Sequence, residues 1–399
     1  MKKITLKTIS SSKAFKLSAL AAFVLGAVLG RVIPGFFDAI AFIGTSYVKL
    51  LKLIVVPLLM TEISLCLYTA AGKYKGRVLR TVGLFVAMFT ATFLLTALIV
   101  GIARPGIGLE LLGEDWTGTL AATTVQDFFA NIISDNILAS MAAGSMLPCI
   151  LFAFVFGIAA HHMKAEKAMG VVEDIKGVFE RILDNVLVLT PLGVFSLMGS
   201  ASAQYGASVL GTGARYIATA WGLSAAALVI VMILPVWIFA GINPVSYIRR
   251  AAKVWLMTLS TCSSAATLPT TVRVCNEEFG VPEEVTDIVV PLGCTIHMCG
   301  GAVSFCLLGL FTLQMAGIPL TIGTFLYMLI VAVLMNMAAP GIPGGGIELG
   351  ATYLTILGAP TGFIGLYSGI YRVLDMAYTT LNVTGDITAN VLIQKWEKK

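Results

Sequence analysis

Five polar side chains near the C-terminus share a spacing that places them on one face of a helix. They stand at relative positions 0, 3, 4, 7 and 11 and are Asp375, Tyr378, Thr379, Asn382 and Asp386. The surrounding stretch is mostly apolar. A carboxylate in a membrane helix costs about 2.5 to 3.5 kcal/mol near the bilayer centre, so such groups normally bind cations, ammonium groups or protons. Two simpler explanations stay open: Asp386 could be interfacial, and Asp375 could only pair with Arg372.

A second polar cluster interrupts the apolar stretch 288–315, where residues 293–301 read GCTIHMCGG. A helix broken there frees backbone carbonyls, which can complete a cation shell begun by Asn382 and Asp386. His297 and Cys299 are softer ligands that suit a soft divalent metal, and a histidine can also titrate near neutral pH. A purely structural His297 remains the simpler alternative.

The composition predicts that these clusters lie in a membrane. Of the 399 residues, 58% are hydrophobic and only 12% are charged, with a mean hydropathy of +0.92. Soluble domains carry about 25% charged residues. The basic residues occupy short loops without a basic and aromatic face, so nucleic acid is not an expected partner. The expected partner is the lipid bilayer.

Charge also predicts the topology. Lysines precede the first apolar run, and a basic loop follows two spans at residues 73–80. Residues 105–136 carry five acidic side chains and no Lys or Arg, which is typical of an external segment. Basic loops and loops without basic residues continue to alternate through the first six spans. We therefore expect a multi-pass protein of the cell (inner) membrane with both termini in the cytoplasm.

Two segments in the second half look like re-entrant hairpins. The hydroxyl-rich stretch 258–271 predicts a hairpin at about 254–279 with its tip at Ser263–Pro269, and the Gly/Pro-rich stretch 336–346 predicts another at about 325–361. Each precedes a span with polar interruptions. One follows a cytoplasmic loop and the other an external loop, as in an inverted repeat, which brings binding sites to the bilayer midplane. Ordinary loops between spans are the alternative.

Three motifs in these segments resemble those of one known family. They are SSAATLP at 263–269, GIPGG at 341–345 and NVTGD at 382–386. With them the chain resembles the glutamate transporter family of dicarboxylate/amino acid:cation symporters. Weaker likeness at 50–59 and 147–159 extends the resemblance over nearly the whole chain.

The resemblance implies an all-α membrane protein with eight transmembrane helices and two re-entrant hairpins, a homotrimer and an elevator motion. It implies scaffold spans 1–2 in residues 1–80, span 3 of the transport domain and the external acidic loop in 81–136, and scaffold spans 4–5 in 137–212. The rest of the transport domain is 213–399, with span 6, the two hairpins, span 7 at about 283–316 and span 8 at about 362–395.

The resemblance also implies the site. Asp375 would receive a substrate amino group, while Ser264, Asn382 and the second hairpin would hold a carboxylate. The full substrate set is Ser263, Ser264, Gly301, Ile342, Pro343, Gly346, Asp375, Tyr378, Thr379 and Asn382. The cation set is Gly293, Thr295, His297, Met298, Cys299, Asn382 and Asp386.

Two departures from the family pattern qualify these expectations. The family's NMDGT motif is His297-Met298-Cys299-Gly300-Gly301 here, so one sodium site is expected to be lost. Coupling to three sodium ions is then not expected. Coupling to fewer sodium ions or to protons through Asp375, Asp386 or His297 remains open, as does binding of a soft divalent metal.

The second departure is Tyr378, which stands where members that carry acidic amino acids have an arginine. A phenol donates one hydrogen bond where arginine binds a carboxylate with two. We therefore expect a symporter of a neutral amino acid or related metabolite, without a resident cofactor. The alternatives are a dicarboxylate or acidic amino acid symporter that uses Arg372, or an uncoupled channel or sensor. No enzyme motif such as HExxH is present, so an enzyme is not expected.

Overall fold

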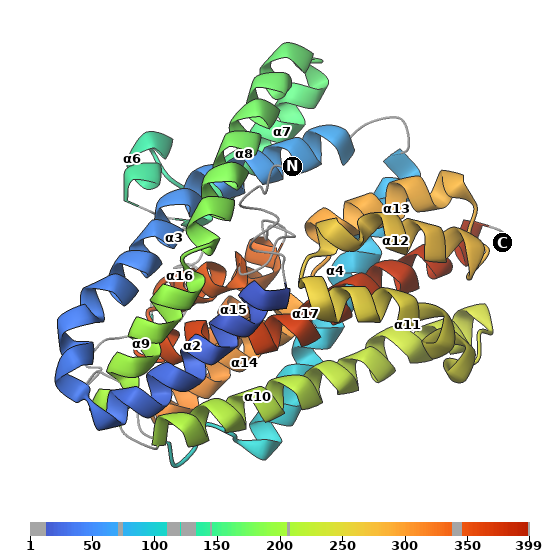
Figure 1. The fold of residues 1–399 in the computed structure, drawn as a ribbon. Helices are drawn as coiled ribbons and strands as arrows, with labels where there is room; N and C mark the ends of the chain where they lie inside the picture. Colours follow the sequence, from blue (N-terminus) through green and yellow to red (C-terminus); the bar gives the residue numbers. More distant parts are fainter. Residues whose placement is uncertain are drawn as a thin grey trace, which may run out of the picture.

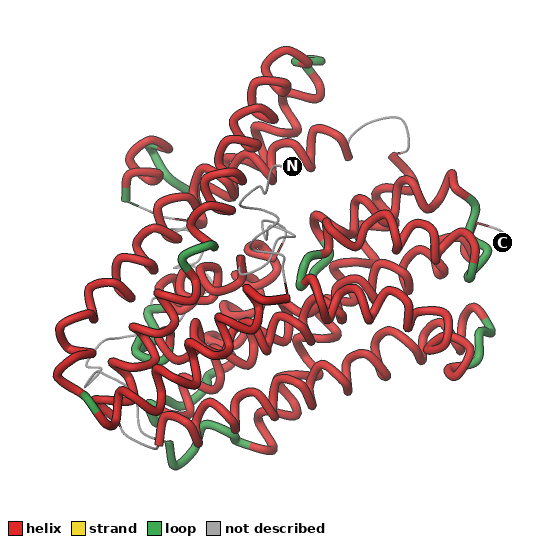
Figure 2. The backbone as a smooth tube through the Cα atoms, in the orientation of Figure 1, coloured by secondary structure: helices red, strands yellow, loops and turns green. Residues whose placement is uncertain are grey.

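The computed structural model describes residues 13–70, 75–109, 120, 133–143, 146–205, 208–336 and 345–397, and within them every regular element is a helix (Figures 1 and 2). The predicted all-helical class is therefore confirmed. Three helical stretches among these residues are long and apolar enough to cross a membrane: Gly76–Ala103, Gly211–Ala240 and Glu283–Met315.

The elements of the first half are α2 (Lys13–Val32), α3 (Pro34–Ala70), α4 (Lys75–Ala103), α6 (Ile137–Ala142), α7 (Met146–His162), α8 (Glu166–Leu187), α9 (Thr190–Tyr205) and α10 (Ser208–Ala227), which continues into π-helical η1 (Leu228–Ile233) and η2 (Val236–Ala240). Those of the second half are α11 (Pro244–Thr261), α12 (Ser264–Glu277), α13 (Glu283–Ile296), α14 (Cys299–Met315), α15 (Ile322–Asn336), α16 (Gly345–Leu357) and α17 (Ile364–Glu397).

Helix α3 packs against α7, α8 and α9, and α2 packs mainly against α9. Figure 1 shows α2, α3, α8 and α9 together on one side of the molecule. Gly26 and Gly30 lie one turn apart on α2, and a Cβ at either would collide with the backbone of α9. Small residues at this spacing allow helices to approach closely, which favours packing inside a membrane.

Helix α17 lies among the helices of the second half and contacts α4, α10, α11, α12, α13, α14 and α16. Nearly every residue of α14 is buried, and so is most of α17 between Ile364 and Ile393. A helix that is buried on all sides belongs to the centre of a bundle. Most polar side chains of α17 between Ser368 and Asn390 are therefore buried inside the bundle.

Helices α11 and α12 form the first hairpin, hairpin 1, and its turn is shorter than expected. Cys262 ends α11 in a left-handed conformation with φ 50°, and Ser263 caps α12 by accepting a hydrogen bond from Ala266 N at 3.2 Å. The tip is thus Cys262–Ser263, and the predicted tip Ser263–Pro269 was too long because the serine cap starts the helix at once. Pro269 lies inside α12.

Helices α15 and α16 pack together as hairpin 2. Residues 337–344, which include Ile342 and Pro343, lie outside the described residues. Between the hairpins, the predicted break in span 7 occurs at His297 and Met298, whose backbones are extended or irregular between α13 and α14.

Candidate functional site

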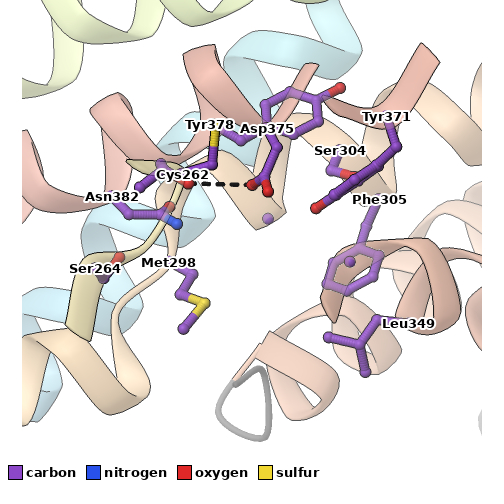
Figure 3. A pocket seen from close by; sticks show the side chains of 13 residues that line it. Cys262, Ser264, Met298, Ser304, Phe305, Leu349, Tyr371, Asp375, Tyr378 and Asn382 are labelled. Carbon is purple, nitrogen blue, oxygen red and sulfur yellow. Dashed lines mark hydrogen bonds between the residues drawn. The ribbon is translucent and has the colours of Figure 1, made fainter. Parts of the chain in front are cut away.

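A pocket lies where both hairpins meet α14 and α17 (Figure 3). The described residues that line it are Cys262, Ser264, Met298, Gly301, Ser304, Phe305, Gly346, Leu349, Tyr371, Asp375, Tyr378, Thr379 and Asn382. Seven of the ten predicted substrate residues are among them: Ser264, Gly301, Gly346, Asp375, Tyr378, Thr379 and Asn382. Ser263 stands next to Ser264 as the α12 cap. The chain thus brings together segments more than a hundred residues apart.

Asp375 is the only charged side chain among the described residues that line the pocket. It is 6% exposed, and the Thr379 hydroxyl donates a hydrogen bond to its Oδ1 at 3.1 Å. A buried carboxylate that lines a pocket favours a ligand group with positive charge. No Lys or Arg of the described lining offers a second carboxylate a partner.

Asn382 fixes the contact between α17 and the first turn of α14. Its Oδ1 accepts a hydrogen bond from Gly300 N at 2.7 Å, which leaves the Nδ2 group able to donate to a ligand. A Cβ at Gly300 would collide with the backbone of Tyr378, so this position requires glycine for the two helices to approach. The pocket wall therefore depends on Gly300.

Tyr378 lines the pocket, but its hydroxyl does not face Asp375. Figure 3 shows the ring leading away from the Asp375 carboxylate, and its buried Oη lies near Tyr216 and Ser304. The hydroxyl of Tyr371 points the other way, toward the Asp375 side of the pocket, and it lies against Gly346. Of the two phenols, Tyr371 is better placed to meet a ligand.

Sequence reasoning missed six of the lining residues as substrate contacts: Cys262, Met298, Ser304, Phe305, Leu349 and Tyr371. Tyr371 precedes Asp375 by one helical turn, so the spacing of the polar face contained a signal for it. Ser304 follows Gly301 on the same face of α14. Phe305 and Leu349 are ordinary apolar residues and carry no such signal.

A second cluster lies beside the pocket at the break in span 7. His297 is 1% exposed, its Nδ1 lies 3.0 Å from Oδ1 of Asp386, and its Nε2 lies 3.0 Å from Sγ of Cys299. Phe85 stacks on the imidazole with a centroid distance of 4.4 Å. The imidazole thus bridges the Asp386 carboxyl group and the Cys299 thiol. Both ring nitrogens are thus engaged.

Two glycines make room for this cluster. A Cβ on Gly385 would collide with the His297 ring, and a Cβ on Gly293 would collide with the Asp386 carboxyl group. The imidazole and the carboxyl group therefore each lie against the bare backbone of a helix. The imidazole and the carboxyl group fit only because Gly385 and Gly293 have no side chain.

The predicted cation residues divide between the two clusters. Gly293, His297, Cys299 and Asp386 lie in the His297 cluster, whereas Met298 and Asn382 line the pocket. The Thr295 hydroxyl donates to Leu292 O within α13 at 2.8 Å. His297, Cys299 and Asp386 lie close together, but over the described ranges no group of three His, Cys, Asp or Glu side chains is arranged so that it could hold a metal ion.

The comparison with known families covers almost the entire chain. The model described as "Sodium:dicarboxylate symporter family" matches residues 15–396. The chain belongs to the sodium:dicarboxylate symporter family. This confirms the resemblance drawn from the motifs, and membership indicates a membrane protein of solute transport by symport.

Individual relatives agree with this assignment. The chain is 28% identical over 397 residues to the proton/glutamate-aspartate symporter of Bacillus subtilis, covering 95% of this chain and 94% of the relative. It is 26% identical over 393 residues to the C4-dicarboxylate transport protein of Sphingopyxis alaskensis, covering 95% and 88%. The proton/sodium-glutamate symport protein of Bacillus caldotenax is 26% identical over 405 residues, covering 94% and 92%.

Proposed function

We propose that this symporter-family chain carries a small amino acid with an uncharged side chain across the membrane together with cations. The observation that supports this most directly is the charge of the pocket, where Asp375 is the only charged side chain among the described lining residues. A ligand ammonium group would pair with Asp375, whose orientation Thr379 supports.

The opposite end of the ligand would meet groups suited to a carboxylate. Ser264 is the first residue of α12, and the N-terminus of a helix attracts negative charge. The Nδ2 group of Asn382 supplies a further donor. The ligand side chain would then lie toward Phe305, Leu349 and Tyr371, which are apolar or carry a neutral hydroxyl.

A second candidate follows from the names of the relatives, which state glutamate, aspartate or C4-dicarboxylates as transported solutes. For such a solute, Arg372 would have to supply the second positive charge. A second carboxylate in the described pocket would otherwise face Asp375 and an apolar wall, and burying an unpaired charge there is costly. This argument favours the neutral amino acid.

Coupling and motion remain part of the proposal. We propose coupling to protons or to fewer than three sodium ions, because His297 and Cys299 replace family cation ligands. By the family resemblance, α4 and residues 213–399 would move as a transport domain past the scaffold of α2, α3 and α7–α9 in a homotrimer. Both termini would face the cytoplasm of the cell membrane.

Uptake and counterflow in proteoliposomes test the proposal. Labelled alanine, serine, aspartate and succinate are compared under an imposed sodium gradient, a proton gradient or neither. We expect gradient-driven uptake and counterflow of a neutral amino acid, with a sodium Hill coefficient below three if sodium is used. Preference for succinate or aspartate would favour the second candidate, and flux without counterflow would indicate a channel.

A further inference from the structure

Helix α17 carries a second polar stripe beside the one that faces the pocket. Its members, Thr380, Thr384 and Thr388, follow one another at intervals of four residues on the side of α17 turned toward α11. Arg372 lies about two turns before Thr380. By helical spacing Arg372 lies between the pocket residues Asp375 and Thr379 and the threonine stripe, so its contacts and not its spacing decide its role.

Hydrogen bonds join this stripe to α11 along most of its length. The Tyr247 and Thr388 hydroxyls lie 2.9 Å apart, Trp255 Nε1 donates to Thr384 Oγ1 at 2.8 Å, and the Thr258 and Thr380 hydroxyls lie 2.8 Å apart. At the hairpin tip, Arg372 Nη2 donates to the carbonyl oxygen of Thr261 at 3.3 Å. The arginine is the last contact of a series that fastens hairpin 1 to α17.

The Thr261 carbonyl is one that a helix cannot satisfy by itself. Thr261 is the last residue of α11, and the final carbonyls of a helix lack internal donors. A cation at this end also interacts favourably with the helix dipole. Cys262 and Ser263 follow at once, and then the pocket residue Ser264, so the position of Thr261 sets the position of the tip.

We propose that Arg372 is a positioning residue that holds the tip of hairpin 1 against α17, and that it does not bind the carboxylate of the solute. Arg372 is not among the described residues that line the pocket, although its neighbours Tyr371 and Asp375 are. The inference rests on transport through this pocket as proposed above, but not on which solute is carried.

The experiment compares full-length Arg372→Met, Arg372→Lys and the control Arg249→Met in proteoliposomes. Arg249 is exposed near the start of the same hairpin arm, far along α11 from the tip. We expect Arg372→Met to raise KM for every transported solute by the same factor, about tenfold for loss of one charged hydrogen bond. Arg372→Lys should recover most of this change, and Arg249→Met should match the wild type.

A second measurement does not depend on transport. Hydrogen exchange of the purified protein, followed by mass spectrometry, should show faster exchange at residues 262–264 in Arg372→Met and no change there in Arg249→Met. If exchange is faster in Arg372→Met but the wild-type protein takes up no solute, the proposed function is refuted and the positioning role of Arg372 stands. Should the Met variant fail to accumulate, Arg372→Gln enters the same comparison. Unchanged KM and exchange, or selective loss of acidic solutes with neutral ones spared, would overturn the assignment.

Discussion

The Nδ1 atom of His297 lies 3.0 Å from Oδ1 of Asp386, although 89 residues separate the two along the chain. The histidine interrupts span 7, and the aspartate lies within the last helix. Their contact joins the helix break to α17 in the interior of the bundle. It also supplies the hydrogen-bond partner that the structure shows for a buried carboxyl group, which burial would otherwise destabilise.

We expect the two side chains to be strongly coupled in stability. Removing one partner of a buried hydrogen bond typically costs about 1 to 3 kcal/mol, because the other polar group remains buried without a partner. His297→Leu should therefore lower the free energy of unfolding in detergent strongly, and His297→Leu with Asp386→Ala should cost less than the sum of the single changes. Chemical denaturation of the four proteins of this double-mutant cycle measures the coupling. Additive effects would contradict the pairing.

Gly385 should be intolerant of even one methyl group. In Gly385→Ala the new Cβ would collide with the His297 ring, and overpacking of this kind typically costs about 1 to 3 kcal/mol. Gly365 on the same helix is the matched control, because a Cβ there meets no atom within 4 Å. Gly365→Ala should keep or raise the melting temperature, since alanine favours a helix. Equal melting temperatures for the two variants would argue against the tight contact.

Asp375→Asn should distinguish amino acids from simple dicarboxylates. The amide keeps the size of the side chain but loses the charge that attracts an ammonium group. We expect Kd for a neutral amino acid to rise at least about tenfold, which corresponds to about 1.4 kcal/mol. Succinate, which has no ammonium group, should not bind more weakly.

The exposed Asp287 provides the control Asp287→Asn, which should behave as the wild type. Isothermal or thermal-shift titrations of the purified proteins provide the comparison. An Asp375→Asn protein with unchanged amino acid affinity would exclude the proposed ammonium contact.

Tyr378→Arg should improve the binding of acidic amino acids. A guanidinium at this position can reach back along the pocket wall and bind a side-chain carboxylate with two hydrogen bonds. Tyr378→Phe is the control and should leave aspartate affinity at the wild-type level, since the Tyr378 ring leads away from the Asp375 carboxylate. If aspartate binds no better to the arginine variant, the correspondence of this helix to the family motif is in error at that residue.

Local signals in the sequence predicted several features of the second half that the structure shows. Hydroxyl-rich and Gly/Pro-rich segments predicted two hairpins, the run GCTIHMCGG predicted a broken helix, and the helical spacing of Asp375, Asn382 and Asp386 predicted a common polar face. Each depends on backbone preferences or on the helical period, which act over a few residues. In the structure, α11 and α12 form a hairpin, the helix is interrupted at His297, and Asp375, Asn382 and Asp386 are buried on α17.

The contact partners of these side chains were decided by the tertiary structure alone. The direction of the Tyr378 ring, the contact of His297 with Asp386 and Cys299, and the use of Arg372 at the end of α11 all depend on how helices distant in sequence pack. A helical period states which side chains share a face but not which helix that face meets. For this reason the sequence identified Arg372 as a candidate solute ligand, whereas the packing of α11 on α17 places its guanidinium on the hairpin carbonyl.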